Sequence, residues 1–341
     1  MKKIWLILFV LIFYSQENLK AQSTIGRFLL WRPSAESMSM GGTGVSQQLG
    51  GFSMYYNPAG ISDNKTVKAG YSFYRPFSVF EDLIYHYGAA AVSIDKIGTF
   101  AVSVEIYQKS SQLWLDETGA ELGWDDETSK RYRMAYAVDP LPWFSFGVSL
   151  GYFKYKLSKK NVGAENSEPS DDTFFIDAGV LFNKLIPDAS IKFGNLEWLD
   201  DIGDIPQAGF SVGISILNFN FSQKMQMIDK SQADYIPEMF LMGFSYHLLT
   251  SDIVSLNVNV DFEKQIHEES TFDHIRFGGE ARILRILALK AGYVKDTFDP
   301  ETSYGTWGLG IITRYGSYSF ARYNPLFFPT WHHEFKLQLE F

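Results

Sequence analysis

The sequence predicts an all-β fold, a transmembrane antiparallel β-barrel of about 14 strands with its N-terminal segment inside the lumen. Three observations predict it. Apolar and polar residues alternate over most of the chain, as they do in the wall of a membrane barrel. Mean hydropathy is only −0.10 although aromatic residues make up 16%, whereas each membrane helix would need about 20 consecutive apolar residues. A Gly-rich segment without alternation precedes the first strand.

Residues 1–21 are predicted to be a cleaved signal peptide. Lys2 and Lys3 precede an apolar run at 4–14 that is too short to span a bilayer, and Ala21 is a small residue suited to cleavage. Together with a barrel, this export signal predicts that the protein resides in the bacterial outer membrane.

Residues 22–62 are predicted to form a hatch that plugs the lumen. Eight strands already enclose an interior that side chains just fill, so a wider barrel needs another occupant. Glycines allow the tight backbone bends of such a plug, and the motif at 57–60 is a turn signal before the first strand. The residues expected to matter are Gly41, Gly42, Gly44, Asn57, Pro58, Ala59 and Gly60.

Residues 63–341 are predicted to form the barrel. Strands 142–156, 206–219 and 285–296 have small residues on one face, which leaves room for an inserted segment. The expected strands are 65–76, 82–94, 97–109, 130–139, 142–156, 172–183, 206–219, 235–249, 252–264, 272–284, 285–296, 302–315, 316–325 and 330–341.

The links between strands predict the orientation of the chain. Links after even-numbered strands are mostly tight and links after odd-numbered strands are longer. The exception is the long link 184–205, which is either a periplasmic excursion or a region with one more hairpin than the expected strands include. Bacterial barrels have short periplasmic turns and longer external loops. The first strand should therefore start on the periplasmic side. Polar faces such as that of 252–264 are expected to line a wet lumen.

Two apolar stretches near the C-terminus suggest contacts with partners. The last strand ends on alternating apolar residues of the kind that barrel-assembly machinery recognises: Phe335, Leu337, Leu339 and Phe341. The external loop before it exposes Leu326, Phe327 and Phe328, which predicts a binding surface or a lid. The acidic loop 110–129 is either simply solvated or bridged by divalent ions to lipopolysaccharide or to a partner.

Composition and motifs argue against several other functions. A net charge of −9 opposes nucleic-acid binding, which needs a basic surface, and the absence of cysteine excludes thiolate metal sites and disulfides. The sequence has neither a G-x-S-x-G nor an H-E-x-x-H motif. We therefore expect no catalytic residues, no metal site and no cofactor.

Four stretches, in order, resemble the PorV/PorQ family of FadL-like (OmpP1/FadL/TodX-type) outer-membrane proteins. The segment from Met40 to Gly60 is similar to the family's hatch motif, although Tyr56 stands where the family has Trp. The other stretches are 213–218, 278–293 and 319–325. The resemblance implies a fourteen-stranded barrel with an inserted N-terminal hatch.

The resemblance also implies function. PorV/PorQ-like members serve the type IX secretion system, so the first expectation is a non-enzymatic barrel that contacts secretion components or exported proteins. The alternative is a FadL-like channel for long-chain fatty acids or other hydrophobic small molecules, and a structural or adhesive barrel is the third possibility. A channel needs an apolar path beside the hatch, whereas an export partner can have a sealed lumen.

Overall fold

We describe a computed structural model of the chain. The predicted signal peptide and most of the link 184–205 lie outside the described residues. The described residues are 26–62, 66–76, 83–109, 112–115, 118–125, 127–156, 170–186, 209–225, 233–251, 253–267, 272–325 and 328–340.

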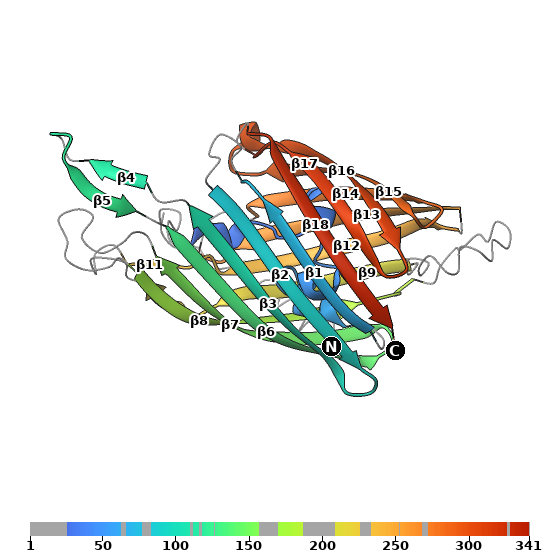
Figure 1. The fold of residues 1–341 in the computed structure, drawn as a ribbon. Helices are drawn as coiled ribbons and strands as arrows, with labels where there is room; N and C mark the ends of the chain where they lie inside the picture. The colour runs from blue at the N-terminus through green and yellow to red at the C-terminus, as the bar shows by residue number, and fades with distance from the viewer. Residues whose placement is uncertain are drawn as a thin grey trace.

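Fourteen antiparallel strands form a closed barrel, which confirms the predicted fold class (Figure 1). Every strand is paired with its neighbours in sequence order, and β18 closes the wall against β1, where Phe335 is opposite Tyr71. The strands are β1 (Thr66–Tyr74), β2 (Leu83–Ile94), β3 (Gly98–Lys109), β6 (Thr128–Leu141), β7 (Phe144–Lys156), β8 (Ser170–Phe182), β9 (Gly209–Phe219), β12 (Met239–Thr250), β13 (Val254–Gln265), β14 (His274–Ile283), β15 (Leu287–Asp296), β16 (Tyr304–Thr313), β17 (Gly316–Tyr323) and β18 (Thr330–Glu340).

All fourteen predicted strands are present, with small shifts at their ends. The largest shift is in β12, which begins at Met239 rather than at residue 235. Pro237, just before it, has no N–H to donate to a ladder. The loop 110–129 also differs from the prediction, because it contains the hairpin of β4 (Gln112–Leu115) and β5 (Glu121–Asp125).

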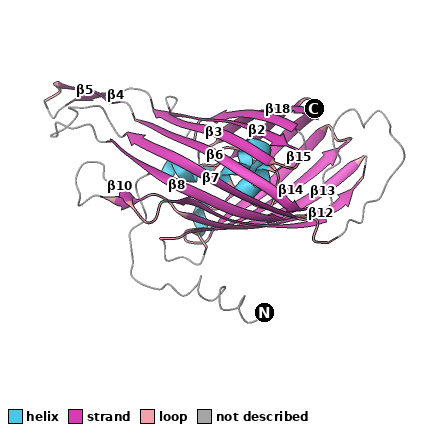
Figure 2. Cartoon of the chain, turned by 90° about the horizontal axis from the view of Figure 1, so that it is seen from below, coloured by secondary structure: helices cyan, strands magenta, loops and turns pink. Residues whose placement is uncertain are grey.

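The barrel has two different ends, seen in Figure 2. The hairpin β4–β5 and the short pair β10 (Lys224–Met225) and β11 (Asp234–Tyr235) lie at one end, here called the loop end. Tight turns such as 95–97 and 314–315 lie at the opposite end, the turn end. This asymmetry agrees with the predicted pattern of long and short links.

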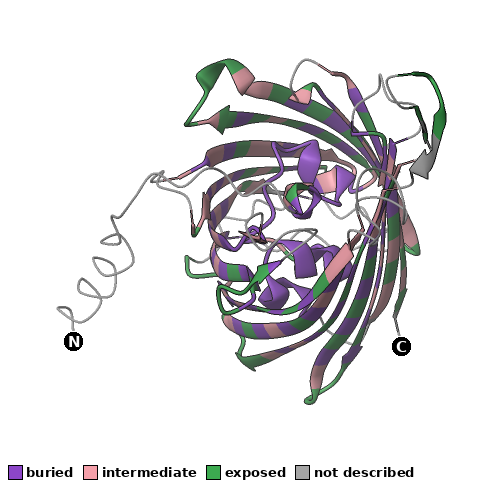
Figure 3. Ribbon diagram, turned by 90° about the vertical axis from the view of Figure 1, so that its left-hand side faces the viewer, coloured by how far each residue is buried: buried purple, intermediate pink, exposed green. Residues whose placement is uncertain are grey.

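The two faces of the wall have opposite character, which gives the alternating colours of the strands in Figure 3. Large apolar side chains face outward, and examples such as Met134, Leu150 and Leu337 are 55–69% exposed. A continuous exposed apolar surface of this extent is unusual for a soluble protein and suits contact with lipid. Inward-facing residues on the same strands, including Arg133 and Glu334, are buried.

The hatch segment, described here as residues 26–62, lies inside the barrel (Figure 3). Its elements are η1 (Arg27–Leu30), α2 (Ala35–Met38), η2 (Gly50–Tyr55) and η3 (Pro58–Ile61). Between them they contact wall strands on several sides: α2 touches β16–β18, η2 touches β1–β3, and η3 touches β6–β8. None of the described helices is long and apolar enough to cross a membrane.

Candidate functional site

The hatch segment rests with its backbone directly on glycines of the wall. Gly147 of β7 faces the backbone of Pro58, and Gly213 of β9 faces the carbonyl group of Val45. At both positions a Cβ atom would overlap the hatch backbone. The small residues on the inner face of these strands therefore set how closely the segment approaches the wall.

The first group of predicted hatch residues makes polar contacts with the wall. Gly41 has a φ of +71°, which favours glycine, and its N–H donates to Thr306 Oγ1 at 2.8 Å. Gly42 also has a positive φ and packs against the stem of Arg32. The N–H of Gly44 donates to the Asp261 carboxylate at 2.7 Å.

The motif at 57–60 is linked to the first group and to the wall by one side chain. Asn57 Nδ2 donates to the carbonyl oxygen of Val45 at 3.0 Å and to that of Val180, in β8, at 2.9 Å. Its Oδ1 accepts from the N–H of Ala59 and so caps η3, in which Pro58 is the first residue. Gly60 lies against Gln47, where a Cβ atom would be 2.6 Å from the carbonyl oxygen.

Buried ion pairs connect the hatch segment to the wall below its loop end. Glu263 accepts from the guanidinium of Arg32 at 2.6 Å and from that of Arg276 at 2.8 Å. Arg276 also donates to the carbonyl oxygen of Gly41 at 3.1 Å. One carboxylate thus joins a hatch arginine to a wall arginine, and all three side chains are at most 6% exposed.

A second buried cluster joins β3, β6, β8 and β9. Arg131 donates to Glu105, and Arg133 donates to Asp177 at 2.9 Å. Both arginines also donate to Asn218 Oδ1, at 3.2 and 3.1 Å. These charges are paired and buried, so the inner face here is not the wet surface expected from its polarity.

Above these charges, an aromatic layer crosses the loop end of the lumen. Phe28 of the hatch segment packs on Phe153 and Tyr107, with ring centroids 5.4 and 5.7 Å apart. Trp31 continues the layer toward Tyr85, at 6.2 Å. Buried apolar side chains from both sides of the lumen belong to the same cluster, among them Tyr74 and Phe175.

The aromatic layer ends in a cavity of about 140 Å³, here called the loop-end cavity. Its lining is mostly apolar, with one guanidinium from the hatch and one from β14. It is lined by Leu30, Trp31, Arg32, Met38, Tyr74, Pro76, Arg276, Tyr304, Tyr323 and Pro325. Nε and Nη1 of Arg32 make no hydrogen bond with any described residue, which gives the cavity a polar corner.

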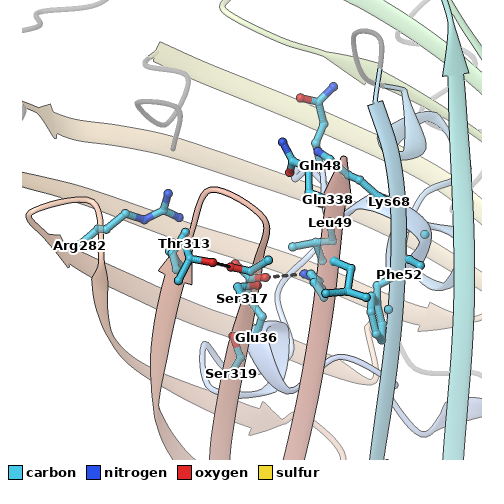
Figure 4. A pocket seen from close by; sticks show the side chains of 18 of the residues that line it. Glu36, Gln48, Leu49, Phe52, Lys68, Arg282, Thr313, Ser317, Ser319 and Gln338 are labelled. Carbon is cyan, nitrogen blue, oxygen red and sulfur yellow. Dashed lines mark hydrogen bonds and ion pairs between the residues drawn. The ribbon is translucent and has the colours of Figure 1, made fainter. Parts of the chain in front are cut away.

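A second cavity, of about 170 Å³, lies at the turn end and has the opposite chemistry (Figure 4). This turn-end cavity lies between hatch residues 48–52 and strands that include β1 and β16–β18. Four cations line it: Lys68, Arg282, Lys290 and Lys336. Glu36, from the same short helix that contributes Met38 to the loop-end cavity, is the carboxylate among its lining residues.

The ladder of backbone hydrogen bonds between the wall strands is interrupted where the aromatic layer reaches β8. Asn218 has a φ of +58°, and its N–H donates to the Asp177 side chain at 2.6 Å instead of continuing the ladder. The pairing of β8 with β9 shifts register there and stops at Ile176. Among the described residues, positions 170–175 of β8 pair only with β7. The loop-end half of the wall therefore has a gap in its ladder beside Phe175.

The predicted C-terminal residues are only partly described. Phe335, Leu337 and Leu339 face outward and are 49–66% exposed, while Phe341 lies outside the described residues. Of the predicted contact loop, Leu326 and Phe327 also lie outside them, and Phe328 is half-buried with its N–H donating to the carbonyl oxygen of Pro325. No group of metal-ligating side chains occurs among the residues that are described.

Sequence reasoning missed the buried ion pairs, both cavities and the ladder gap. The available signal was the charged residues that share one face of a strand, Arg131 and Arg133 in β6 and Arg276, Glu280 and Arg282 in β14. They indicate the inner face but not which residues pair. Asn218 ends the stretch 213–218, but nothing in the sequence indicates that the pairing of β8 with β9 is interrupted there.

No protein-family model matches the sequence, and no curated protein sequence matches it. Solved structures do share the fold. The toluene transporter TbuX of Ralstonia pickettii superposes with a TM-score of 0.54 at 12% identity, covering 89% of this chain and 97% of that one. The monoaromatic hydrocarbon channel CymD gives 0.53 at 12% identity, covering 91% and 97%. The toluene transporter TodX of Pseudomonas putida gives 0.52 at 12% identity, covering 89% and 96%.

These comparisons support the predicted resemblance at the level of the TodX-type fold. The similar structures are transport proteins rather than enzymes. They do not confirm the narrower PorV/PorQ assignment or a role in secretion.

Proposed function

We propose that this chain is an outer-membrane channel that admits small hydrophobic molecules through the loop end. The loop-end cavity carries this proposal. An apolar cavity of about 150 Å³ in another protein stays dry and binds benzene, so a cavity of about 140 Å³ suits a single aromatic ring or a short aliphatic chain. The three solved channels named above are described as transporting toluene or monoaromatic hydrocarbons, which supports the same class of ligand.

We propose that a ligand reaches the cavity along the aromatic layer, whose packed rings must move apart to let it pass. A ligand entering at the ladder gap meets Phe175, then the rings of Phe153 and Phe28, and then Trp31 at the cavity edge. Aromatic side chains offer an apolar surface that tolerates ligands of different shape. The N–H groups at Nε and Nη1 of Arg32 have no partner among the described residues and can donate hydrogen bonds to an oxygen atom of the ligand. Ion pairs below the layer hold the hatch segment in place as a plug against ions.

The test is uptake of labelled ethylbenzene by cells with a lipopolysaccharide outer leaflet that produce the barrel. Leu30→Trp fills the cavity from the hatch segment, and we expect its initial uptake rate to fall to that of cells without the barrel. Leu248→Trp adds the same side chain to the outer wall, where Leu248 is 53% exposed, and should leave uptake unchanged. Equal uptake with and without the wild-type barrel would contradict the proposal.

The assembly partners predicted from the C-terminal strand remain part of the proposal. The outward apolar face formed by Phe335, Leu337 and Leu339 suits contact with lipid. We propose that barrel-assembly machinery recognises this strand through Phe341. Deletion of Phe341 should lower the amount of heat-modifiable, folded barrel without lowering synthesis. An unchanged amount of folded barrel after this deletion would contradict a role of Phe341 in assembly.

The secretion role implied by the PorV/PorQ resemblance stays a second proposal, and one observation favours it. The hairpin β4–β5 projects beyond the wall at the loop end, and Leu113 and Leu115 on it are 37% and 53% exposed (Figure 2). Such residues could contact an exported protein or a secretion component. Removing residues 112–125 should then abolish export and leave ethylbenzene uptake intact, whereas a pure channel would show no export defect.

A further inference from the structure

The outer face of the wall carries charge only near the loop end. By alternation, the charged residues on the outward face of the described strand residues are Asp172, Lys130, Lys154, Lys156, Lys264, Lys295 and Arg322. All of them lie within three residues of the loop-end limit of their strand, and all but one are cations. The whole chain has more acidic than basic residues, 39 against 30, so the excess of cations is particular to this rim. Lys156 and Lys264 already have other interactions within the chain.

Two of these lysines are immediate neighbours across the wall. Lys130 of β6 is directly opposite Lys154 of β7, and both are exposed. Like charges in directly opposite positions on one face of a sheet repel each other. Glu127, the acidic residue just before β6, binds instead to the inward-packed Tyr155, whose hydroxyl donates to its carboxylate at 3.1 Å. An anion placed between the two ammonium groups would relieve their repulsion.

Aromatic rings next to the two lysines place them at the level of lipid headgroups. The next outward pair along the same strands is Tyr132 and Tyr152, with stacked rings whose centroids are 6.4 Å apart. Phe174 of β8 packs on Tyr152 at 5.1 Å and is 64% exposed. Membrane barrels carry such aromatic girdles at both interfaces, and lysine stems extend from apolar surface toward water. The two ammonium groups therefore lie on the loop-end side of a girdle, where the phosphate groups of lipids are found.

The end of the barrel at which the lysines lie decides which lipid they meet. Bacterial barrels have their longer loops outside, so the loop end faces the outer leaflet, which consists of phosphorylated glycolipid. We propose that Lys130 and Lys154 together bind a phosphate group of this glycolipid, with its acyl chains against Tyr152 and Phe174. Asp172, which is opposite Lys154 on its other side, weakens the binding by repelling the phosphate. The surface lies outside the lumen, so it does not depend on hydrophobic transport.

The experiment is native mass spectrometry of the full chain in a non-ionic detergent, titrated with phosphorylated lipid A, dephosphorylated lipid A and phosphatidylglycerol. We expect phosphorylated lipid A to bind most tightly. A lysine near an anionic membrane surface contributes about a fivefold change in affinity, so the double variant Lys130→Gln, Lys154→Gln should bind it about 10- to 25-fold more weakly. Lys96→Gln removes an exposed lysine from the turn 95–97 at the turn end, and as the matched control it should bind like the wild type.

Asp172→Asn supplies the decisive arm of this experiment. It removes the carboxylate beside Lys154 and keeps its size, so affinity for phosphorylated lipid A should rise, whereas a purely structural role for Asp172 would not tighten binding. Glu301→Gln removes an exposed carboxylate between β15 and β16, on the opposite side of the barrel, and should have no effect.

Three results would overturn the proposal. One is equal binding of lipid A with and without its phosphate groups. Another is equal affinity of the double lysine variant and Lys96→Gln, provided that both run as folded, heat-modifiable barrels. The third is binding of phosphatidylglycerol as tight as that of phosphorylated lipid A, because the surface would then not select the glycolipid.

Discussion

The two cavities of the lumen have nearly the same size and opposite chemistry. The loop-end cavity is lined mostly by apolar side chains, four of them aromatic, whereas four cations line the turn-end cavity. The short helix α2 separates them and contributes Met38 to one and Glu36 to the other. The hatch segment therefore does more than fill the lumen, because it divides one barrel into an apolar compartment and a charged one.

The largest expected effect comes from removing the partition. Deleting residues 23–55 takes away η1, α2 and η2, and the wall alone is too wide for its side chains to fill. We expect a nearly silent barrel to become a conducting pore in planar bilayers. If the deletion and the full chain conduct equally, the hatch segment does not separate the compartments.

The next largest effect concerns the ion pairs that hold the hatch segment under the loop-end cavity. Glu263→Gln leaves Arg32 and Arg276 buried without their shared carboxylate, and breaking a buried pair in this way costs about 3–5 kcal/mol. The midpoint of urea unfolding in detergent should fall accordingly. Glu301→Gln, at an exposed site in the loop 297–303, is the control and should leave the midpoint unchanged.

A smaller effect is expected from the link between the two halves of the hatch segment. Asn57→Ala removes hydrogen bonds to Val45 and Val180 and the cap of η3. Unsatisfied buried carbonyl groups and a lost cap together should cost about 1–3 kcal/mol of stability. Trypsin cleavage near Arg32 should become faster. Wild-type cleavage rates in the variant would show that Asn57 does not fix the segment.

The smallest effect is a pH dependence in the charged compartment. Burial opposes ionisation of Glu36, but the ammonium groups of Lys290 and Lys336 outweigh it and hold the pKa of Glu36 well below its usual range. A carboxyl whose folded-state pKa is depressed stabilises the fold above its unfolded pKa, and this stability is lost as pH falls toward the folded pKa. The wild type should therefore unfold at higher urea than Glu36→Gln at pH 7, with a gap that narrows below about pH 4.5. A gap that stays constant down to pH 3 would contradict this linkage.

The sequence alone predicts the wall of this molecule better than its interior. Alternation locates all fourteen strands because the inner and outer faces differ in polarity, as in β13, where Leu256 is exposed and Asp261 is buried. Alternation cannot say which buried charges meet, because Arg133 and Asp177 lie on different strands. It also cannot show a gap that depends on the backbone conformation of Asn218, or a cavity that is enclosed by ten residues from five regions of the chain.

The most direct measurement is a crystal structure of the barrel soaked with 4-bromotoluene, read from the anomalous signal of bromine. The proposed function predicts a bromine peak in the loop-end cavity, between Trp31, Tyr74 and Tyr304, and none in the turn-end cavity. In Leu30→Trp crystals that peak should vanish. Bromine found only on the lipid-facing wall, or inside the charged compartment, would contradict the account.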